Sequence, residues 1–351
     1  MPRPHTIVDV ARKAGVSAST VSRAFNRPHL LEARTLRRVQ SAAAKLEFVP
    51  NALARGLITG RSGFAALVVP DIADPFFGRF AFSLEQALRP EGLALVVCHT
   101  SEQRSEEERL ARLLEERQMD GLICVSEAPG SGRPSPFETS RIPSVFVERR
   151  RVKGAGDEVI LDKRSVSDAI RHLIDLGHRR IGIVPGHLQT FGGRELYLAF
   201  RAALKKHRLK LDSDHVVPGD FKFETSRAAA DTLLRRRSPP TAVFVGSDRM
   251  AQGFFYGLHE LGVRVPEELS VVAFATDLLE SLVAAPVTAC RSISGQIATE
   301  AAHTLLARLR DPDAPPRSVL IPNAFVPGRS TAALRLSRRP GKLTAALRPT
   351  F

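Results

Sequence analysis

Short apolar runs that alternate with segments of helical period constrain the fold of this chain more than any other feature. Segments of helical period, such as 107–116, 165–176 and 194–206, separate these runs. Because hydrophobicity within each run is continuous rather than alternating, the runs are predicted to be strands buried on both faces of a parallel sheet. The runs are 64–69, 93–97, 121–125, 144–147, 180–184, 242–245 and 270–274.

The body from residue 62 onward is therefore predicted to be α/β. Its length and a break near 162–165 favour two doubly wound lobes. In such folds ligands bind at the carboxyl ends of the strands, so a cleft between the lobes is the expected ligand site.

Positive charge is concentrated at the two ends of the chain. Residues 1–61 contain eleven Lys and Arg against three acidic residues, and residues 335–351 add five basic residues and no acid. The whole chain has a formal charge of +14, so the part between these ends is nearly neutral. A short basic segment suits a polyanion partner. A basic arm that only increases solubility has the same composition, so the local sequence pattern is needed to distinguish it from a polyanion-binding segment.

Residues 6–46 carry the pattern of three short helices. Thr6 and Asp9 form a capping-box pattern ahead of a helix that Gly15 ends, and Ser17 is a good N-cap for a second helix. Two helices joined this tightly predict a helix-turn-helix. The third helix, over 34–46, is predicted to close the core. Its inward residues are Leu36, Val39, Ala43 and Leu46, and the first two helices contribute Ile7, Val10, Ala11, Ala14, Val16, Val21 and Phe25.

The string TIVDVARKAGVSASTVSRAFN, from Thr6 to Asn26, resembles the signature of the LacI/GalR family of bacterial transcriptional regulators. The segments FVPN at 48–51 and ARGL at 54–57 resemble that family's hinge, and the resemblance runs through nearly the whole chain. It implies base reading in the major groove of DNA by Ala18, Ser19 and Arg23. It also implies phosphate contacts and capping by Thr6, Ser17, Thr20, Ser22 and Asn26.

The hinge resemblance carries its own expectation. Leu57 matches a leucine that this family wedges into the minor groove at the centre of a palindromic operator, with Ala54 and Arg55 beside it. Gly56 weakens helix propensity by about 1 kcal/mol relative to Ala. The hinge is therefore expected to be disordered off DNA and helical when two hinges pair on DNA. A flexible linker with an incidental Leu57 is the alternative.

The resemblance also divides the chain into parts. Residues 1–49 would form the DNA-binding headpiece, 50–61 the hinge, 62–335 a periplasmic-binding-protein-like effector domain of type I, and 336–351 a basic, disordered tail. The first lobe is expected over 62–163 and 291–322, and the second over 164–290 and 323–335. The chain would then cross three times between the lobes.

Candidate effector-binding residues come from the same resemblance. Arg194 could hold hydroxyls or a carboxylate, and aromatic rings could stack on a ligand ring; a surface ion pair and core packing are the respective alternatives. The family's usual Gly-Phe-Asp-Asp is replaced here by 273–276, which places Ala275 where a carboxylate gathers ligand hydroxyls, and Asp277 could substitute for it. The candidates are Phe76, Phe77, Arg194, Phe221, Ser247 and Thr276.

The effector classes left open are a neutral sugar, a sugar acid, a sugar phosphate and a nucleobase-like compound, together with loss of effector control. The missing carboxylate puts a simple neutral sugar in doubt. The leucines of the tail are interrupted by Pro340 and Gly341, so a homodimer is expected rather than a tetramer held by a leucine-heptad helix.

Several function classes are disfavoured by the sequence. No phosphate-binding loop, nucleophile elbow or HExxH motif occurs, so an enzyme is not expected. The chain shows no signal-peptide pattern and no apolar run of about 18 residues, which favours a cytoplasmic protein. No metal or cofactor is expected: Cys98, Cys124 and Cys290 are interpreted as reduced core residues. The alternative function is a solute-binding protein for transport or sensing with the same body fold.

Overall fold

The structure of the chain is a computed structural model that describes residues 5–26, 28–48, 61–130, 134–149, 157–283 and 286–334. The described residues form two compact units. One comprises those of Met1–Gly63 together with Arg117–Asp120, and the other those of Phe64–Glu116 and Gly121–Phe351. Residues 50–60 of the predicted hinge and all of the predicted tail, 336–351, lie outside the described residues.

The first unit contains a headpiece of three helices, as predicted. Helix α1 spans Ile7–Ala14, α2 Ala18–Asn26 and α3 Ala33–Lys45, with a 3-10 turn at Pro28–Leu30. Small side chains allow the three helices to pack closely around one apolar core. The fully buried members of this core are Val10, Ala11, Ala14, Val21, Ala24, Val39, Ala42 and Ala43.

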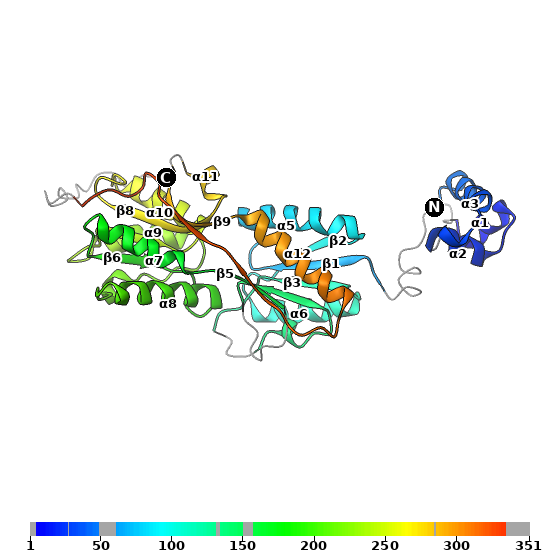
Figure 1. The fold of residues 1–351 in the computed structure, drawn as a ribbon, viewed down its shortest axis with the longest axis horizontal. Helices are drawn as coiled ribbons and strands as arrows, with labels where there is room; N and C mark the ends of the chain where they lie inside the picture. The colour runs from blue at the N-terminus through cyan, green and yellow to red at the C-terminus, as the bar shows by residue number, and fades with distance from the viewer. Residues whose placement is uncertain are drawn as a thin grey trace, which may run out of the picture. The chain divides into compact units, whose positions relative to one another are not determined.

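The second unit contains two α/β lobes, which Figure 1 shows side by side. The sheet of the first lobe has the order β10-β5-β4-β3-β1-β2 and is parallel throughout. Helices α5 (Pro75–Leu88) and α12 (Ser294–Arg310) cover one face of this sheet, and α6 (Arg104–Glu116) lies on the other (Figure 1). The strands are β1 Phe64–Val69, β2 Ala94–His99, β3 Gly121–Cys124, β4 Ser144–Val147, β5 Asp157–Leu161 and β10 Ser318–Ile321.

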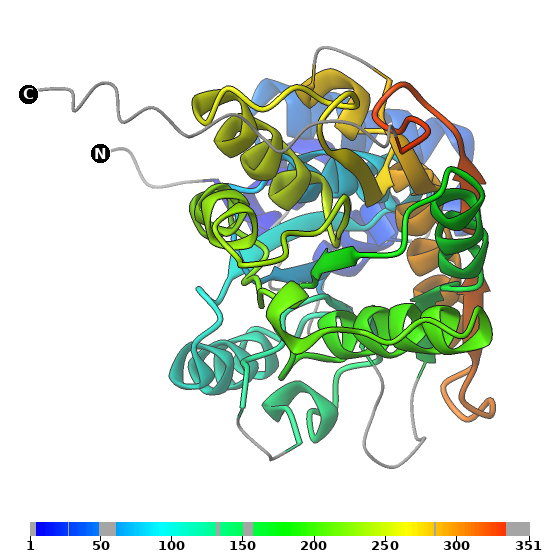
Figure 2. The ribbon, with the colours of Figure 1, turned by 90° about the vertical axis from the view of Figure 1, so that its left-hand side faces the viewer.

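The sheet of the second lobe has the order β11-β9-β8-β7-β6 and lies between two pairs of helices, which Figure 2 shows around its strands. Helices α7 (Ser165–Asp175) and α8 (Phe191–Lys206) pack on one face. Helices α9 (Phe223–Leu234) and α10 (Asp248–Glu260) pack on the other face. The short helix α11 spans Leu279–Leu282. The strands are β6 Ile181–Val184, β7 Ala242–Val245, β8 Ser270–Thr276, β9 Thr288–Ser292 and β11 Ala324–Val326.

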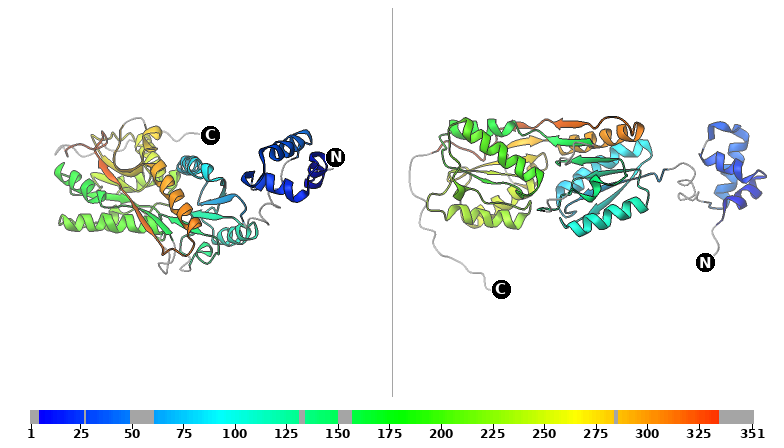
Figure 3. Two further views of the ribbon diagram at one scale, coloured as in Figure 1. Left: turned by 45° about the vertical axis from the view of Figure 1, so that its right-hand side comes forward. Right: turned by 90° about the horizontal axis from the view of Figure 1, so that it is seen from below.

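The chain crosses between the lobes three times, as predicted: after β5, after β9 and between β10 and β11. Figure 3 shows the last crossing as the red-orange segment along one side of both lobes. All seven predicted strands are present. The second sheet also has an edge strand that was not predicted: β11 pairs antiparallel with β9. The edge strand arrives directly from the other lobe, without a crossover helix that would turn it around.

Candidate functional sites

The turn between α1 and α2 is fixed by several short-range contacts. Gly15 adopts a left-handed conformation with φ 62°, which glycine reaches without steric cost. The Val16 N–H donates to the Ala11 carbonyl at 3.0 Å. The Arg38 guanidinium reaches across from α3 and donates to the Ala14 carbonyl at 2.7 Å. A cation at the C-terminus of α1 also complements the helix dipole. No local pattern in the sequence predicts this role of Arg38.

The beginning of α2 is held by Ser17. Its Oγ accepts a hydrogen bond from the Thr20 N–H at 3.2 Å and lies 2.8 Å from the Ser19 Oγ. Ser19 and Arg23 are both exposed and lie four residues apart, so they share one helix face. This face is the one expected to read DNA. Ala18 is half-buried and packs against the headpiece core, so its side chain is less available than those two.

The other predicted DNA-binding residues have mixed placements. Thr6 is the N-cap residue of α1, and its Oγ1 and backbone N–H both donate to the Asp9 carboxylate at 2.8 and 2.9 Å. Thr20 and Ser22 are half-buried, and Asn26 is the last residue of α2. The predicted hinge residues Ala54, Arg55 and Leu57 lie outside the described residues.

A cavity of about 210 Å³ lies between the two lobes of the body. Its lining follows the carboxyl ends of strands in both sheets, as the fold class predicts. Five of the six predicted effector residues line it: Phe76, Phe77, Phe221, Ser247 and Thr276.

Phe221 has the most constrained backbone in this cavity. Its φ is 63°, a left-handed conformation that is unusual for a bulky residue. Its ring rests on Gly186, where a Cβ atom would lie 1.8 Å from the ring Cζ. Strained backbone of this kind often occurs at ligand sites. The glycine thus leaves the space into which the Phe221 ring fits.

The hydroxyl groups of Thr276 and Ser247 have structural partners. The Thr276 Oγ1 and N–H both donate to the Asp248 carboxylate at 2.9 Å. Burial raises the pKa of Asp248 to about 6, although these two donors lower it. The Ser247 Oγ accepts from the Met250 N–H at 3.2 Å and so caps α10.

The cavity also contains charged residues that the sequence analysis did not identify. Lys163 donates to Glu148 at 2.7 Å, and its Nζ lies 5.4 Å from the centre of the Phe274 ring. Both groups follow strands of the first lobe. Lys163 went unrecognised because β5 was not predicted, so its end could not be assigned to the cleft. Glu148 follows the predicted strand 144–147, but the sequence analysis did not single it out.

Polar contacts between described residues join the lobes around the cavity. Arg249 of α10 donates to the Ala73 carbonyl at 2.9 Å. Glu127 accepts from the N–H of Phe191, the first residue of α8, at 2.7 Å. Lys222 lies 3.8 Å from Glu102. A change in the angle between the lobes would break these contacts.

Two residues that the sequence analysis considered for the cavity are not among those that line it. Arg194 does not line it: its side chain is 62% exposed and lies 3.9 Å from Glu195. Helix α8 begins at Phe191, one turn before the predicted start, and Leu196 faces the cavity instead. Ala275 does line the cavity, but Asp277 does not replace the missing carboxylate. Asp277 instead accepts hydrogen bonds from the Ser294 N–H and Oγ, both at 2.8 Å.

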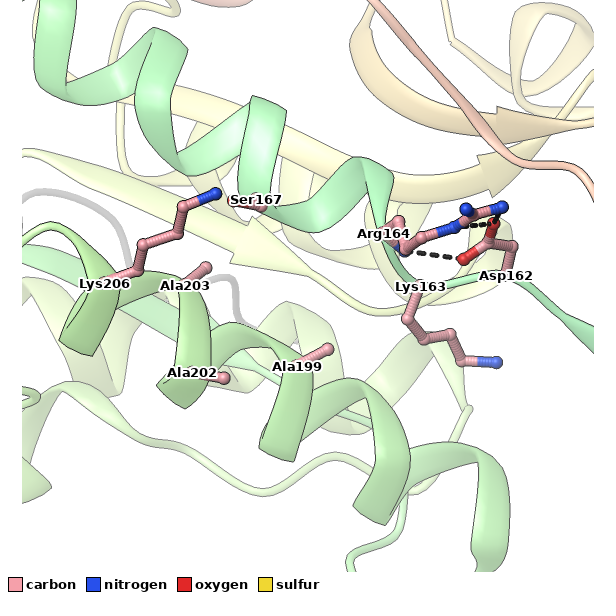
Figure 4. A pocket seen from close by; sticks show the side chains of 8 residues that line it. All are labelled: Asp162, Lys163, Arg164, Ser167, Ala199, Ala202, Ala203 and Lys206. Atoms are coloured by element: carbon pink, nitrogen blue, oxygen red, sulfur yellow. Dashed lines mark hydrogen bonds and ion pairs between the residues drawn. The ribbon is translucent and has the colours of Figure 1, made fainter.

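A second, more open depression lies between α7 and α8 and is drawn in Figure 4. Its floor consists of Ala199, Ala202 and Ala203, and Arg164 at its edge is bonded to Asp162. No polar groups converge on its centre in Figure 4, so we assign it no function.

Neither a metal centre nor a membrane span is found in the described part of the chain. No group of three or more His, Cys, Asp or Glu residues there could hold a metal ion. None of the described helices is long and apolar enough to cross a bilayer. Cys124 and Cys290 are buried and unpaired, and burial raises the pKa of each thiol to about 12.

Comparison with known proteins shows which families this chain matches. Residues 6–51 match the model of bacterial regulatory proteins of the lacI family, and residues 170–331 match the periplasmic binding protein-like domain. The transcriptional regulator DegA of Bacillus subtilis is 28% identical over 94% of this chain and 98% of its own length. The transcriptional repressor PurR of Pectobacterium atrosepticum is 31% identical over 77% of this chain and 80% of its own length.

Solved structures show the same fold. The lac repressor dimer bound to operator and the anti-inducer ONPF matches with a TM-score of 0.81 and 22% identity, over 94% of this chain and all of that one. A complex of the transcriptional regulator CelR with cellobiose matches with a TM-score of 0.69 and 27% identity, over 93% and 99% of the two chains. These relatives are regulators rather than enzymes. This chain therefore belongs to the LacI family of bacterial regulatory proteins and is a DNA-binding transcriptional regulator with a two-lobed effector domain.

Proposed function

We propose that this regulator binds a palindromic DNA operator as a homodimer, represses transcription there, and is controlled by a small metabolite in the cavity between its lobes. The observation that supports this most is the exposed face of α2, on which Ser19 and Arg23 stand free of the headpiece core. The turn contacts described above hold this face rigid, as a recognition surface requires.

Arg23 is the main base-reading residue of the proposal. An arginine donates two parallel hydrogen bonds to guanine in the major groove, which is the commonest specific contact between proteins and DNA. Ser19, one turn earlier, reads the neighbouring base, and Ala18 contributes an apolar contact. Phosphate contacts and capping are assigned to Thr6, Ser17, Thr20, Ser22 and Asn26.

The hinge, 50–61, is proposed to be the second DNA-contacting element. Two hinge helices pair at the centre of the operator, and Leu57 enters the minor groove there with Ala54 and Arg55 beside it. Insertion of an apolar side chain between base steps kinks DNA at a cost of a few kcal/mol, which the additional contacts offset.

Effector control is proposed to act through the angle between the lobes. The contacts from Arg249, Phe191 and Lys222 across the cavity depend on that angle. A ligand that favours one angle favours or opposes hinge pairing, typically by about 1–3 kcal/mol. The candidate classes are a sugar, a sugar acid, a sugar phosphate and a nucleobase-like compound. Effector contacts are assigned to Phe76, Phe77, Phe221, Ser247 and Thr276.

The proposed location is the bacterial cytoplasm, at the chromosome. The relatives supporting this are named as an HTH-type transcriptional regulator and an HTH-type transcriptional repressor. A solute-binding protein with the same body fold is the alternative, and it would bind the metabolite without any affinity for an operator.

Substitution of Arg23 tests the DNA-reading part. With an operator obtained by selection from random duplexes, Arg23→Ala is expected to weaken operator binding by about 1–3 kcal/mol, measured by fluorescence anisotropy at fixed salt. Binding to random duplex should weaken much less. Leu57→Ala should likewise weaken binding to the operator more than binding to random duplex. Arg37→Ala, which removes an exposed charge from α3, is the matched control and should affect both duplexes alike. Equal losses on both duplexes for Arg23→Ala would contradict the reading role.

A further inference from the structure

We propose that the cavity between the lobes accepts a ligand that carries no negative charge and that offers hydroxyl or ammonium donors together with an apolar ring face. This inference rests on the proposed function, in which the effector occupies this cavity. It narrows the candidate classes to neutral and amino sugars and nucleobase-like rings, and it excludes sugar acids and sugar phosphates.

Carboxylates outnumber basic groups in the lining. Seven carboxylates and three basic side chains line the cavity among the described residues. A cleft lined mainly by charge of one sign concentrates ligands of the opposite sign and repels those of the same sign. The seven are Asp71, Asp74, Glu102, Glu127, Glu148, Asp220 and Asp248.

Each basic group already has a protein partner. Lys163 bonds Glu148 at 2.7 Å and the Leu161 carbonyl at 3.0 Å. Arg249 bonds the Ala73 carbonyl, and Lys222 pairs with a carboxylate of the lining. An anionic ligand would therefore have to break one of these contacts to gain a cation.

The carboxylates, in contrast, keep capacity to accept hydrogen bonds. Asp74 accepts from the Phe76 N–H at 2.9 Å, and Glu127 from the Phe191 N–H at 2.7 Å. An ionised carboxylate has about four acceptor sites, so one backbone donor leaves most of them for a ligand. Hydroxyl and ammonium groups are the donors that these sites fit.

Ser292 provides an independent indication of a ligand. It ends β9, is only 3% exposed, and lines the cavity. Its Oγ has no hydrogen-bond partner among the described residues. A buried hydroxyl without a partner is costly, so a group that enters the cavity and bonds it would be stabilised. The rings of Phe76, Phe221 and Phe274 supply apolar surface around the same space.

The sign of the charge in the cavity can be measured before the effector is known. Ser247→Cys and, separately, Ser292→Cys place a thiol in the lining. Each variant is treated with a cationic and an anionic alkylthiosulfonate of equal size, and the ratio of the two modification rates is compared with that of Ala228→Cys. Ala228 is exposed on α9, directly after Arg227 and four residues after Glu224 along the chain. The unmodified chain controls for its three native cysteines.

The ratio of cationic to anionic rates in the cavity should exceed that at Ala228→Cys by about 10-fold or more, falling as salt is added. Adding Glu102→Gln to the Ser247→Cys variant should lower the ratio, whereas Glu85→Gln, which neutralises a surface carboxylate paired with Arg89, should not. A cavity ratio equal to the surface ratio, or a preference for the anionic reagent, would overturn the inference.

Protection of the same thiol separates this inference from the proposed function. The probes are glucose, glucosamine, glucuronate, glucose 6-phosphate and adenine, each tested for slowing of thiol modification and for thermal stabilisation. Protection by a neutral or cationic probe supports both proposals. Protection by glucuronate or glucose 6-phosphate alone overturns the charge inference while supporting an effector in the cavity. A cationic preference without protection by any probe supports the charge inference and counts against the proposed effector role.

Discussion

Individual residues in the cavity between the lobes are held in place by groups far away in the sequence. Gly186 leaves room for the ring of Phe221, and Asp248 fixes Thr276 through two hydrogen bonds. Both arrangements join the ends of different strands and helices. The shape and the charge of the cavity therefore depend on single groups: the absent Cβ of Gly186 and the buried carboxylate of Asp248.

The buried carboxylate of Asp248 predicts a particular pH dependence of stability. Its folded pKa of about 6 lies above the ordinary 3.8, so the folded state binds this proton more tightly than the unfolded state. The stabilisation from the proton is complete below 3.8 and is lost as the pH rises through about 6. Relative to Asp248→Asn, the unfolding free energy of the native chain should fall by about 3 kcal/mol across that interval.

Urea unfolding of both chains between about pH 4 and pH 7 measures this difference. Comparison with Asp248→Asn cancels the titration of the other carboxylates. If the unfolding free energy of the native chain relative to Asp248→Asn stayed constant or rose with pH, Asp248 would not be held in this environment.

At the scale of elements, the sequence predicts strands with continuous apolar runs well and strands with polar residues poorly. The prediction of 64–69 agrees with β1 at both ends, whereas β5 was missed because it begins with Asp157 and Glu158. Arg308 donates to Asp157 at 2.8 and 2.9 Å from 151 residues away, so burial of this carboxylate has no local signature.

The residues of the candidate site also fall into those that the sequence predicted and those that it did not. The aromatic residues of the cavity were found because they follow predicted strands, as Phe76 follows β1. Arg194 was misplaced because the predicted start of its helix was wrong by one turn. Ser292 and Lys163 were not found because Ser292 ends β9 and Lys163 follows β5, and local periodicity reveals neither strand. Non-local pairing thus accounts for most of what the sequence could not predict.

Close packing of α9 and α10 gives a prediction at this scale. A Cβ atom on Gly253 would lie 2.2 Å from the Phe223 carbonyl oxygen, so Gly253→Ala forces the two helices apart. We expect a loss of about 1–3 kcal/mol of unfolding free energy, measured by urea denaturation. Gly78→Ala in α5 is the matched control, since nothing lies within 4 Å of its Cβ position. That control should gain up to about 1 kcal/mol from helix propensity. Equal stability of Gly253→Ala and the native chain would contradict the close approach.

At the scale of the whole molecule, the three crossings between the lobes allow a ligand in one cavity to act on both lobes at once. The first lobe follows the hinge in the chain, so in the proposed dimer we expect the first lobes of the two subunits to adjoin. Phe82 of α5 in this lobe is 64% exposed and is our candidate for the surface at which the two subunits meet.

Phe82→Glu is accordingly expected to weaken dimerisation. A buried aromatic at the centre of an interface commonly contributes 2 kcal/mol or more, so the dimer dissociation constant should rise by about 30-fold. Sedimentation velocity over a range of concentrations measures this change. Leu198→Glu, at a 43% exposed apolar residue of α8 in the second lobe, is the control and should leave the dimer intact. A dimer unaffected by Phe82→Glu would place the interface elsewhere.

Selection of DNA by the full-length chain tests the central claim most directly. Random duplexes are bound at fixed salt, and the retained fraction is amplified and sequenced over several rounds. A dimer that reads DNA through two α2 helices predicts enrichment of one sequence with two-fold symmetry, and the Arg23→Ala chain should lose the preference at a guanine in each half. Recovery of no enriched sequence, or of one without two-fold symmetry, would contradict the account.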